Sequence, residues 1–297
     1  FTSNAFKVVW KYLEEYGCDY KVMNNGAIEV FEKGNDSSKL VATSAHLDTL
    51  GLMVRSIKAN GALALTTLGS PVTPSLDGEY CNIYTRSGKV YKGTIQSTSP
   101  AIHVFDDSKT KQRSIENLEV RLDEKVLSKD DVKKLGIQNG DIVAYDPKFE
   151  ITDSGFLKTR FIDDKASVVV LLMLLKYMKE NNKKFKYDTK IYFVVYEEVG
   201  HGSSMIDRNV CEYVSLDMGC IGLDLEGNEY AVSICAKDSG GPYDYELTTT
   251  YDEENELFDN PNKLKQDYDD KVLSVGFEYK FQPGEEFMTK TKLTKII

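Results

Sequence analysis

The chain has 297 residues, of which 41% are hydrophobic and 28% charged, enough for one large globular domain or two ordinary ones. Its net charge of −10 argues against nucleic acid or an anionic membrane surface as the main partner. The longest apolar run, residues 168–175, is too short to cross a bilayer, and the opening FTSNAFKVVW predicts no signal peptide. We therefore expect a cytoplasmic protein whose five cysteines are free, mostly buried thiols.

The segment 1–69 has the character of an α/β domain. Its predicted elements are an amphipathic helix over 4–16, strands over 27–31 and 40–45, and a β-hairpin over 51–57 and 62–67. The hairpin is predicted because Asn60-Gly61 is the strongest short-range signal for such a turn. The second predicted strand runs directly into His46 and Asp48.

Between residues 70 and 157 the sequence changes to short β-rich segments with closely spaced turn signals. One short helix is predicted over 129–135, with Ser128 as its N-cap and Gly136 after its last turn. A block of this kind inside an α/β pattern indicates a small inserted β-barrel or sandwich-like module.

The α/β pattern resumes over 158–250. The predicted elements are a helix over 165–179, a strand over 189–196, a helix over 204–209, and strands over 214–217 and 230–235. Because the strand 189–196 alternates little, we expect both of its faces to be covered. The remaining segment, 251–297, is polar and acidic, with one weak strand candidate over 275–281, and no fold is predicted for it.

Acidic and imidazole side chains follow the predicted strands where each strand ends. The stretches SAHLD, RFIDDKAS, VVYEEVGHG and VSLDMG contribute His46, Asp48, Asp163, Asp164, Glu197, Glu198 and Asp217. Because ligands bind at the carboxyl edge of an open α/β sheet, we expect all four stretches at one cleft. Each stretch alone also has a plainer interpretation, as a hydrogen-bonded pair, a turn or helix cap, or a solvated charge.

The adjacent glutamates Glu197 and Glu198 suggest what the cleft does. Two like charges held close together are unfavourable unless a cation lies between them or one carboxyl keeps its proton. A metal ion would resolve this, with one carboxylate as a ligand and the other accepting a proton from water. One imidazole and several carboxylates suit Zn²⁺, Co²⁺ or Mn²⁺, and the surplus of carboxylates favours two ions sharing a bridging aspartate.

In this order the motifs resemble the M42 family of metallo-aminopeptidases, which includes glutamyl aminopeptidases and self-compartmentalised tetrahedral aminopeptidases. The resemblance runs from FTSN at the first residue to about residue 250, and includes YEEVGHGSS, SLDMG and KDSGGPYDYEL. It implies an α/β metallopeptidase (phosphorylase/hydrolase-like) fold interrupted by a PDZ-like β-barrel. The implied organisation is a catalytic domain over 1–69 and 158–250, a dimerisation insert over 70–157, and an unassigned acidic tail over 251–297.

The resemblance also implies a role for each residue of the cleft. The implied metal ligands are His46 and Asp217 for one ion, Glu198 for the other, and Asp163 as the bridge between them. Glu197 would be the general base, and Asp48 would orient His46. The implied reaction is the removal of N-terminal residues from peptides by metal-activated water, carried out by a homo-oligomer between a dimer and a dodecamer.

The chain departs from the family pattern at several places. Lys165 stands where an arginine is usual, the N-terminal motif is short as in a truncated chain, and the tail does not match. The family supplies a late histidine to the metal that Glu198 would bind, whereas the histidines here are His46, His103 and His201. We therefore expect a weakened or half-occupied second metal site. The alternatives are a metal-dependent deacylase, and an inactive or half-metallated subunit that acts only by assembly.

Overall fold

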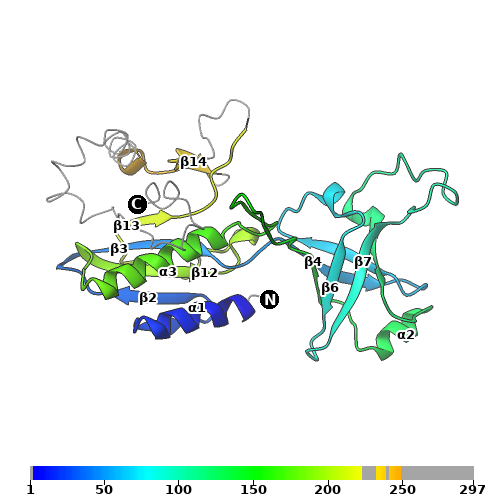
Figure 1. Cartoon of the computed structure of the whole chain (residues 1–297), viewed down its shortest axis with the longest axis horizontal. Coiled ribbons are helices and arrows are strands. Elements are labelled where there is room, and N and C mark those ends of the chain that lie inside the picture. Colours follow the sequence, from blue (N-terminus) through cyan, green and yellow to red (C-terminus); the bar gives the residue numbers. More distant parts are fainter. Residues whose placement is uncertain (1–2, 223–231, 239–240, 249–297) are drawn as a thin grey trace.

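Two bodies lie side by side in the structure: an open α/β sheet with its helices, and a β-barrel (Figure 1). The computed structural model describes residues 3–222, 232–238 and 241–248. The chain leaves the sheet after His46 and returns to the α/β body with the long helix α3 (Lys165–Glu180), so the barrel interrupts the α/β fold. None of the helices in these ranges combines the length and the apolarity that a membrane span requires.

The open sheet has five strands in the order β1-β2-β12-β3-β13. Their bounds are β1 (Tyr20–Val22), β2 (Ile28–Glu32), β3 (Asp36–His46), β12 (Tyr187–Val194) and β13 (Glu212–Ser215). β3 is parallel to β12 on one side and to β13 on the other, whereas β2 pairs antiparallel with β12 and with β1. The predicted α/β class is therefore confirmed, and the carboxyl ends of three parallel strands meet at one edge.

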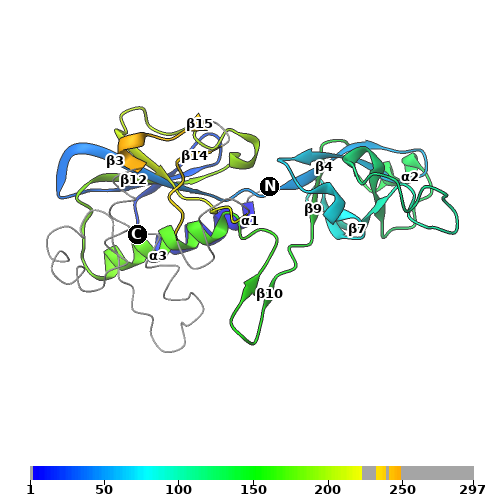
Figure 2. The same cartoon turned by 90° about the horizontal axis from the view of Figure 1, so that it is seen from above.

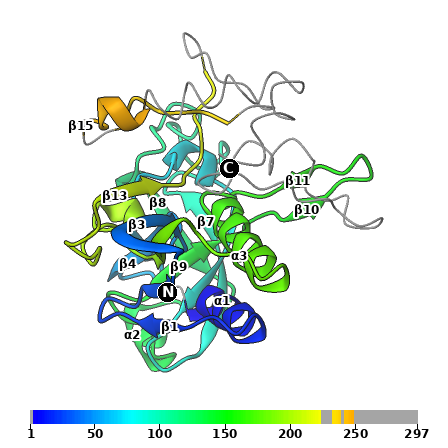
Figure 3. The ribbon, with the colours of Figure 1, turned by 90° about the vertical axis from the view of Figure 1, so that its left-hand side faces the viewer.

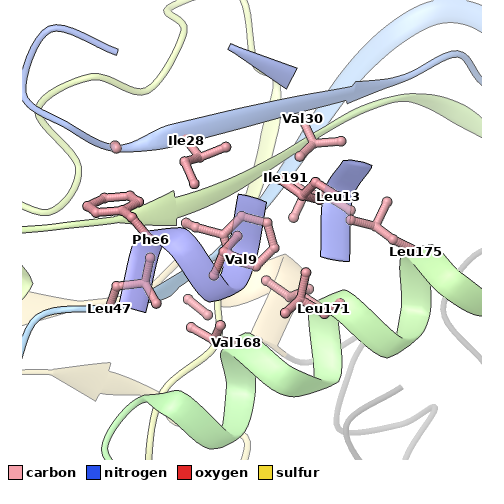
Figure 4. Packing of buried hydrophobic residues seen from close by; sticks show 14 of the residues in the cluster. Phe6, Val9, Leu13, Ile28, Val30, Leu47, Val168, Leu171, Leu175 and Ile191 are labelled. Atoms are coloured by element: carbon pink, nitrogen blue, oxygen red, sulfur yellow. The ribbon is translucent and has the colours of Figure 1, made fainter. Parts of the chain in front are cut away.

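Two helices, α1 (Ser3–Glu15) and α3 (Lys165–Glu180), cover the same face of this sheet (Figure 4). Leu13, Leu175 and Ile191 lie in the shared apolar cluster and are completely buried. Each large aliphatic side chain buried in this way contributes about 1.5–3 kcal/mol to stability. Both helices start within one residue of their predicted starts, because their apolar spacing is read directly from the sequence.

A loop, rather than a helix, covers part of the other face of the sheet. Tyr192 and Val194 are buried there against Ile206 and neighbouring residues, so both faces of β12 are covered, as predicted. The helix predicted over 204–209 is wrong, since these residues form turns. The reason lies in Asp207, whose carboxylate accepts the backbone N–H of Asn209 and forms an ion pair with Lys190 of β12. These contacts favour a turn over a helix.

The second body is a closed barrel of six strands in the order β4-β5-β8-β7-β6-β9. Their bounds are β4 (Gly51–Ile57), β5 (Leu63–Leu68), β6 (Tyr80–Tyr84), β7 (Val90–Ser97), β8 (Leu118–Leu122) and β9 (Ile142–Tyr145). Alternate side chains fill the interior, including Leu52, Leu63 and Ile95, which are completely buried. The predicted short helix is present as α2 (Lys129–Lys134), and the Ser128 hydroxyl caps it by accepting the backbone N–H of Asp131.

The barrel begins earlier in the chain than the predicted boundary at residue 70. The hairpin β4–β5 was assigned to the catalytic segment 1–69, but it supplies two of the six barrel strands. The correction has a physical reason: local periodicity reveals a hairpin, whereas its sheet is decided by the distant pairing of Leu52 with Val143. After the last barrel strand a small hairpin, β10 (Glu150–Ile151) and β11 (Leu157–Lys158), projects away from both bodies (Figures 2 and 3).

Only short elements follow β13 in the described ranges. Residues 232–235, the described part of the strand predicted over 230–235, are not in a strand. Two-residue strands β14 (Lys237–Asp238) and β15 (Gly241–Pro242) pair with each other. The segment 251–297, with its strand candidate over 275–281, lies outside the described residues. All five cysteines lie inside them and are free thiols, as predicted, but the expectation that most are buried is wrong, since only Cys18 and Cys81 are buried and the other three are exposed.

Candidate metal centre

The carboxyl ends of β3, β12 and β13 bring the predicted cleft residues to one edge of the sheet, on the side where the chain crosses to the barrel (Figure 1). His46 ends β3, the two glutamates open the 3₁₀ turn η3 (Glu197–Val199) after β12, Asp217 follows β13, and Asp163 precedes α3. Strands that are parallel neighbours end at the same edge, which is why segments far apart in the chain meet there.

One imidazole and two carboxylates form the centre of this edge. The Nε2 atom of His46 lies 2.8 Å from Asp163 Oδ1 and 3.8 Å from Asp217 Oδ1. One ligand atom from each of the three residues lies within 4.8 Å of the other two. The His46 side chain is only 2% exposed, whereas those of Asp163 and Asp217 are 48% and 40% exposed. The group is therefore anchored inside the protein and open to solvent, and its donor set fits a divalent metal ion.

The negative charge around His46 changes its acidity. Burial by itself lowers the pKa of His46, but the hydrogen bonds that its ring donates to Asp163 and Asp48, with the charges of Asp164 and Asp217, outweigh burial and raise it to about 11. A proton on the imidazole thus serves as the counter-charge of the surrounding carboxylates. A divalent ion would supply the same counter-charge, so the electrostatics of the site also fit a metal.

The neighbouring carboxylates also change the pKa values of the two glutamates. Burial raises the pKa of Glu197, and the charges of Asp217 and Asp48 raise it further. Burial and the charge of Asp163 raise the pKa of Glu198 to about 7. The Oε2 atom of Glu197 lies 3.6 Å from Nε2 of His46, at the rim of the metal-ligand group. Both carboxylates are thus held where a nearby cation stabilises their ionised forms.

Asp48 connects the end of β3 to η3. Its two carboxylate oxygens accept the backbone N–H groups of Glu197 and Glu198, each at 3.2 Å, and so cap this turn. Its backbone carbonyl lies 3.1 Å from Nδ1 of His46, and its Oδ1 lies 3.6 Å from the same nitrogen. The resemblance implies only an orienting contact with His46, whereas the geometry adds control over the turn that carries both glutamates.

Two further residues, Asp164 and Lys165, belong to the site although no role is predicted for them. Asp164 is fully buried, and its Oδ2 accepts the backbone N–H of His46 at 3.0 Å; the peptide bond before it is cis. Lys165 donates from Nζ to the Leu47 carbonyl at 3.4 Å. Burial lowers the pKa of Lys165, although nearby carboxylates act in the opposite direction. The signal in the sequence was the charged triplet DDK directly before an apolar helix.

Gly69 brings the barrel into contact with the site. It lies just after β5 with φ of +71°, and a Cβ atom there would lie 3.0 Å from the Glu198 carbonyl oxygen and 2.5 Å from Leu50 Cδ2. A side chain at this position would therefore press on the turn that carries Glu198. The pattern Leu-Gly-Ser-Pro predicts a turn there, but nothing in the sequence indicates the contact.

Within the described ranges, only one group of three potential metal-binding residues is present, and it includes neither His103 nor His201. Glu198 lies outside that group. A second ion between Asp163 and Glu198 would therefore have these two carboxylates as its described protein ligands.

Comparisons with known proteins show the family of the chain. The sequence pattern of the M42 glutamyl aminopeptidase family matches residues 26–256. The putative aminopeptidase YhfE of Bacillus subtilis is 42% identical over 251 residues, which are 83% of this chain and 72% of that protein. The lysyl aminopeptidase of Pyrococcus furiosus is 24% identical over 190 residues, 63% of this chain and 52% of that one.

Solved structures show the same fold. The TET1 peptidase of Pyrococcus horikoshii, whose description says that it can assemble into a tetrahedron or a large octahedral shell, superimposes with a TM-score of 0.71. The match covers 85% of this chain and 75% of the TET1 chain at 21% identity. An aminopeptidase of Desulfurococcus kamchatkensis matches with a TM-score of 0.62 and 22% identity, over 76% of this chain and 60% of its own.

Proposed function

Because the chain belongs to the M42 glutamyl aminopeptidase family, we propose that it is a dinuclear, metal-dependent aminopeptidase that removes N-terminal residues from peptides. The observation that carries this proposal is the ligand group His46, Asp163 and Asp217, with the Glu197 carboxylate beside it. Two further facts support the proposal: the group is open to solvent on its carboxylate side, and related proteins are named aminopeptidases.

His46 and Asp217 would hold one divalent ion, Glu198 the other, and Asp163 would bridge them. The preference of imidazole and carboxylate donors favours Zn²⁺, Co²⁺ or Mn²⁺. When bound, the ions would polarise the scissile carbonyl and make water a better nucleophile near neutral pH.

Glu197 is the proposed general base. It would accept the proton of the attacking water and then donate it to the departing amine. A general base works best when its pKa is close to the working pH, and burial moves the pKa of Glu197 upward in that direction. Asp48 would support this step by holding η3 through two backbone hydrogen bonds.

We also propose that the protein is a homo-oligomer, between a dimer and a dodecamer, with the barrel as a PDZ-like dimerisation module. The tetrahedral and octahedral assemblies of the TET1 peptidase support this proposal. Large apolar side chains on exposed barrel segments support it as well, including Val72 at 72% and Val104 at 73% exposure.

The adjacent glutamates provide the decisive experiment. Glu197→Gln should lower kcat on leucine and glutamate anilides by about 10²–10⁴-fold while the metal content stays unchanged. Glu198→Gln should lower the metal content instead, because it removes the charge of a ligand. Metal per chain, measured by elemental analysis after dialysis against micromolar Co²⁺, separates the two roles. Near-normal turnover in Glu197→Gln would show that the base is a different residue.

One observation favours the half-metallated alternative. The described ligands of the second ion are two carboxylates without an imidazole, a set that holds Zn²⁺ or Co²⁺ weakly. About one ion per chain with no turnover would support that alternative over the enzyme. Cleavage of N-acyl amino acids but not of aminoacyl anilides would instead identify a deacylase.

A further inference from the structure

A second buried aspartate lies directly behind the metal-ligand group. Asp164 is 0% exposed and occupies the N-cap position of α3, yet its carboxylate makes no capping hydrogen bond to that helix. Its Oδ2 instead accepts the backbone N–H of His46 at 3.0 Å, from a residue 118 positions away in the chain. Its Oδ1 is buried and has no hydrogen-bond partner within the described ranges.

This arrangement is costly, which points to a specific use. An aspartate at an N-cap usually accepts a backbone N–H of its own helix, and a buried carboxylate is usually hydrogen-bonded through both oxygens. Asp164 does not cap α3 through a backbone N–H, and its Oδ1 has no hydrogen-bond partner among the described residues. Its carboxylate interacts with the Ser167 side chain in the first turn of α3, but the backbone N–H that it accepts belongs to the strand end that carries a predicted metal ligand.

The doublet Asp163-Asp164 therefore holds His46 at two points. Asp163 Oδ1 contacts the imidazole Nε2 at 2.8 Å, and Asp164 Oδ2 contacts the main-chain nitrogen of the same residue at 3.0 Å. Since the two aspartates are consecutive, the second contact fixes the backbone of β3 relative to the residue that provides the first. The spacing between the imidazole and the Asp163 carboxylate is then set by the protein before any ion binds.

We propose that Asp164, at the start of α3, is a positioning residue of the metal centre. It holds His46 in register with Asp163 by accepting the His46 backbone N–H. The inference rests on the proposed function, in which His46 and Asp163 are metal ligands. Asp164 acts through His46 and touches neither the ion nor the substrate.

The barrel contains a matched control for this test. Asp141 is 1% exposed, its Oδ2 accepts the backbone N–H of Gln138 at 2.8 Å, and its Oδ1 also lacks a partner in the part of the chain that the structure describes. The two aspartates thus share burial, one backbone hydrogen bond and one unpartnered oxygen. They differ in what they hold, because the partner of Asp141 is a barrel turn and the partner of Asp164 is a predicted metal ligand.

The experiment is a Co²⁺ titration of the full chain, followed by the visible absorption of the bound ion, with folding checked by circular dichroism. Asp164→Ala should weaken Co²⁺ binding by about 10–100-fold and alter the spectrum, as losses of supporting contacts do. Asp164→Asn keeps an acceptor oxygen and should bind Co²⁺ within about threefold of the wild type. Asp141→Ala should lower the melting temperature and leave Co²⁺ affinity and spectrum unchanged.

The Co²⁺ titrations can overturn the positioning role of Asp164 in two ways. Wild-type affinity and spectrum in Asp164→Ala would overturn the positioning role, and so would a loss above tenfold in Asp164→Asn, which would indicate a role for charge. If Asp164→Ala does not fold, Asp164→Leu, which fills the same space without an acceptor, replaces it. If the wild-type chain itself fails to bind Co²⁺, the proposed function fails, and that outcome is distinct from failure of the inference.

Discussion

The barrel and the carboxyl edge of the sheet differ in how their carboxylates are paired with positive charge. In the barrel, carboxylates lie against basic side chains: Lys58 and Glu119 are 2.6 Å apart, and Arg113 and Asp77 are 2.8 Å apart. At the sheet edge, several carboxylates gather around one imidazole, and the nearby Lys165 forms no ion pair within 4.0 Å with a carboxylate of the described part of the chain. The barrel balances its charges locally, whereas the edge is left short of positive charge, as a cation site requires.

The largest expected effect comes from removing the imidazole around which the carboxylates of the edge gather. His46→Ala should weaken Co²⁺ binding by more than about 100-fold, since losing a ligand costs at least as much as losing a supporting contact. Isothermal titration with Co²⁺ measures the change. Glu119→Gln, which breaks an ion pair of the barrel, should leave Co²⁺ binding unchanged and cost less than about 1 kcal/mol. Equal affinities in wild type and His46→Ala would remove His46 from the metal site.

The stability of the metal-free protein should depend on pH because of the edge. The pKa of Glu198 rises from 4.5 to about 7 on folding, so its proton stabilises the fold at low pH and this contribution is lost as pH rises through 7. The pKa of His46 rises from 6.5 to about 11, so its contribution is complete below 6.5 and declines as pH rises toward 11. The melting temperature of the metal-free protein should therefore fall between about pH 5 and pH 8.

The effect of added metal on the melting temperature should also depend on pH. Saturating Co²⁺ should raise the melting temperature at about pH 8 more than at pH 5, because its ligands must release their protons before they bind. Scanning calorimetry at both pH values, with and without Co²⁺, tests this expectation. A melting temperature of the metal-free protein that is flat or rising over this range would contradict the charge deficit at the edge.

A pair of glycines tests whether the barrel and the site are coupled. Gly69→Ala and Gly88→Ala both place a side chain at positive φ, +71° and +85°, which costs about 1–2 kcal/mol. Only Gly69 has a neighbour in the site, because nothing lies within 4 Å of a Cβ at Gly88. Gly69→Ala should therefore also lower kcat, whereas Gly88→Ala should lower stability alone. Equal kcat values in the two variants would show that the contact with Glu198 has no effect on the reaction.

The smallest expected effect belongs to the barrel alone. Ser128→Ala removes the N-cap of α2 and should cost about 1 kcal/mol, measured by urea denaturation. Co²⁺ affinity should not change, because α2 lies on the far side of the barrel from the sheet (Figure 1). A change in metal affinity would mean that barrel stability and the metal site are linked.

Much of the site follows from the sequence. Strand ends can be recognised locally, and the rule that ligands bind at the carboxyl edge of parallel strands predicted that His46, Asp163, Glu197 and Asp217 would meet, as they do. The roles assigned to these residues remain predictions for the experiments above. The helices α1 and α3 and the hairpin β4–β5 were also predicted, because each depends on a repeat or a turn within a few residues.

The tertiary structure alone decided the rest. Several decisive contacts link residues far apart in the chain. They are the pairing that places the hairpin β4–β5 in the barrel, the backbone hydrogen bonds of Asp48 and Asp164, and the contact of Gly69 with Glu198. The sequence determined which chemical groups the chain carries to the edge of the sheet. Their spacing was decided by packing and by long-range hydrogen bonds, whose partners cannot be recognised from local periodicity because they share no local pattern.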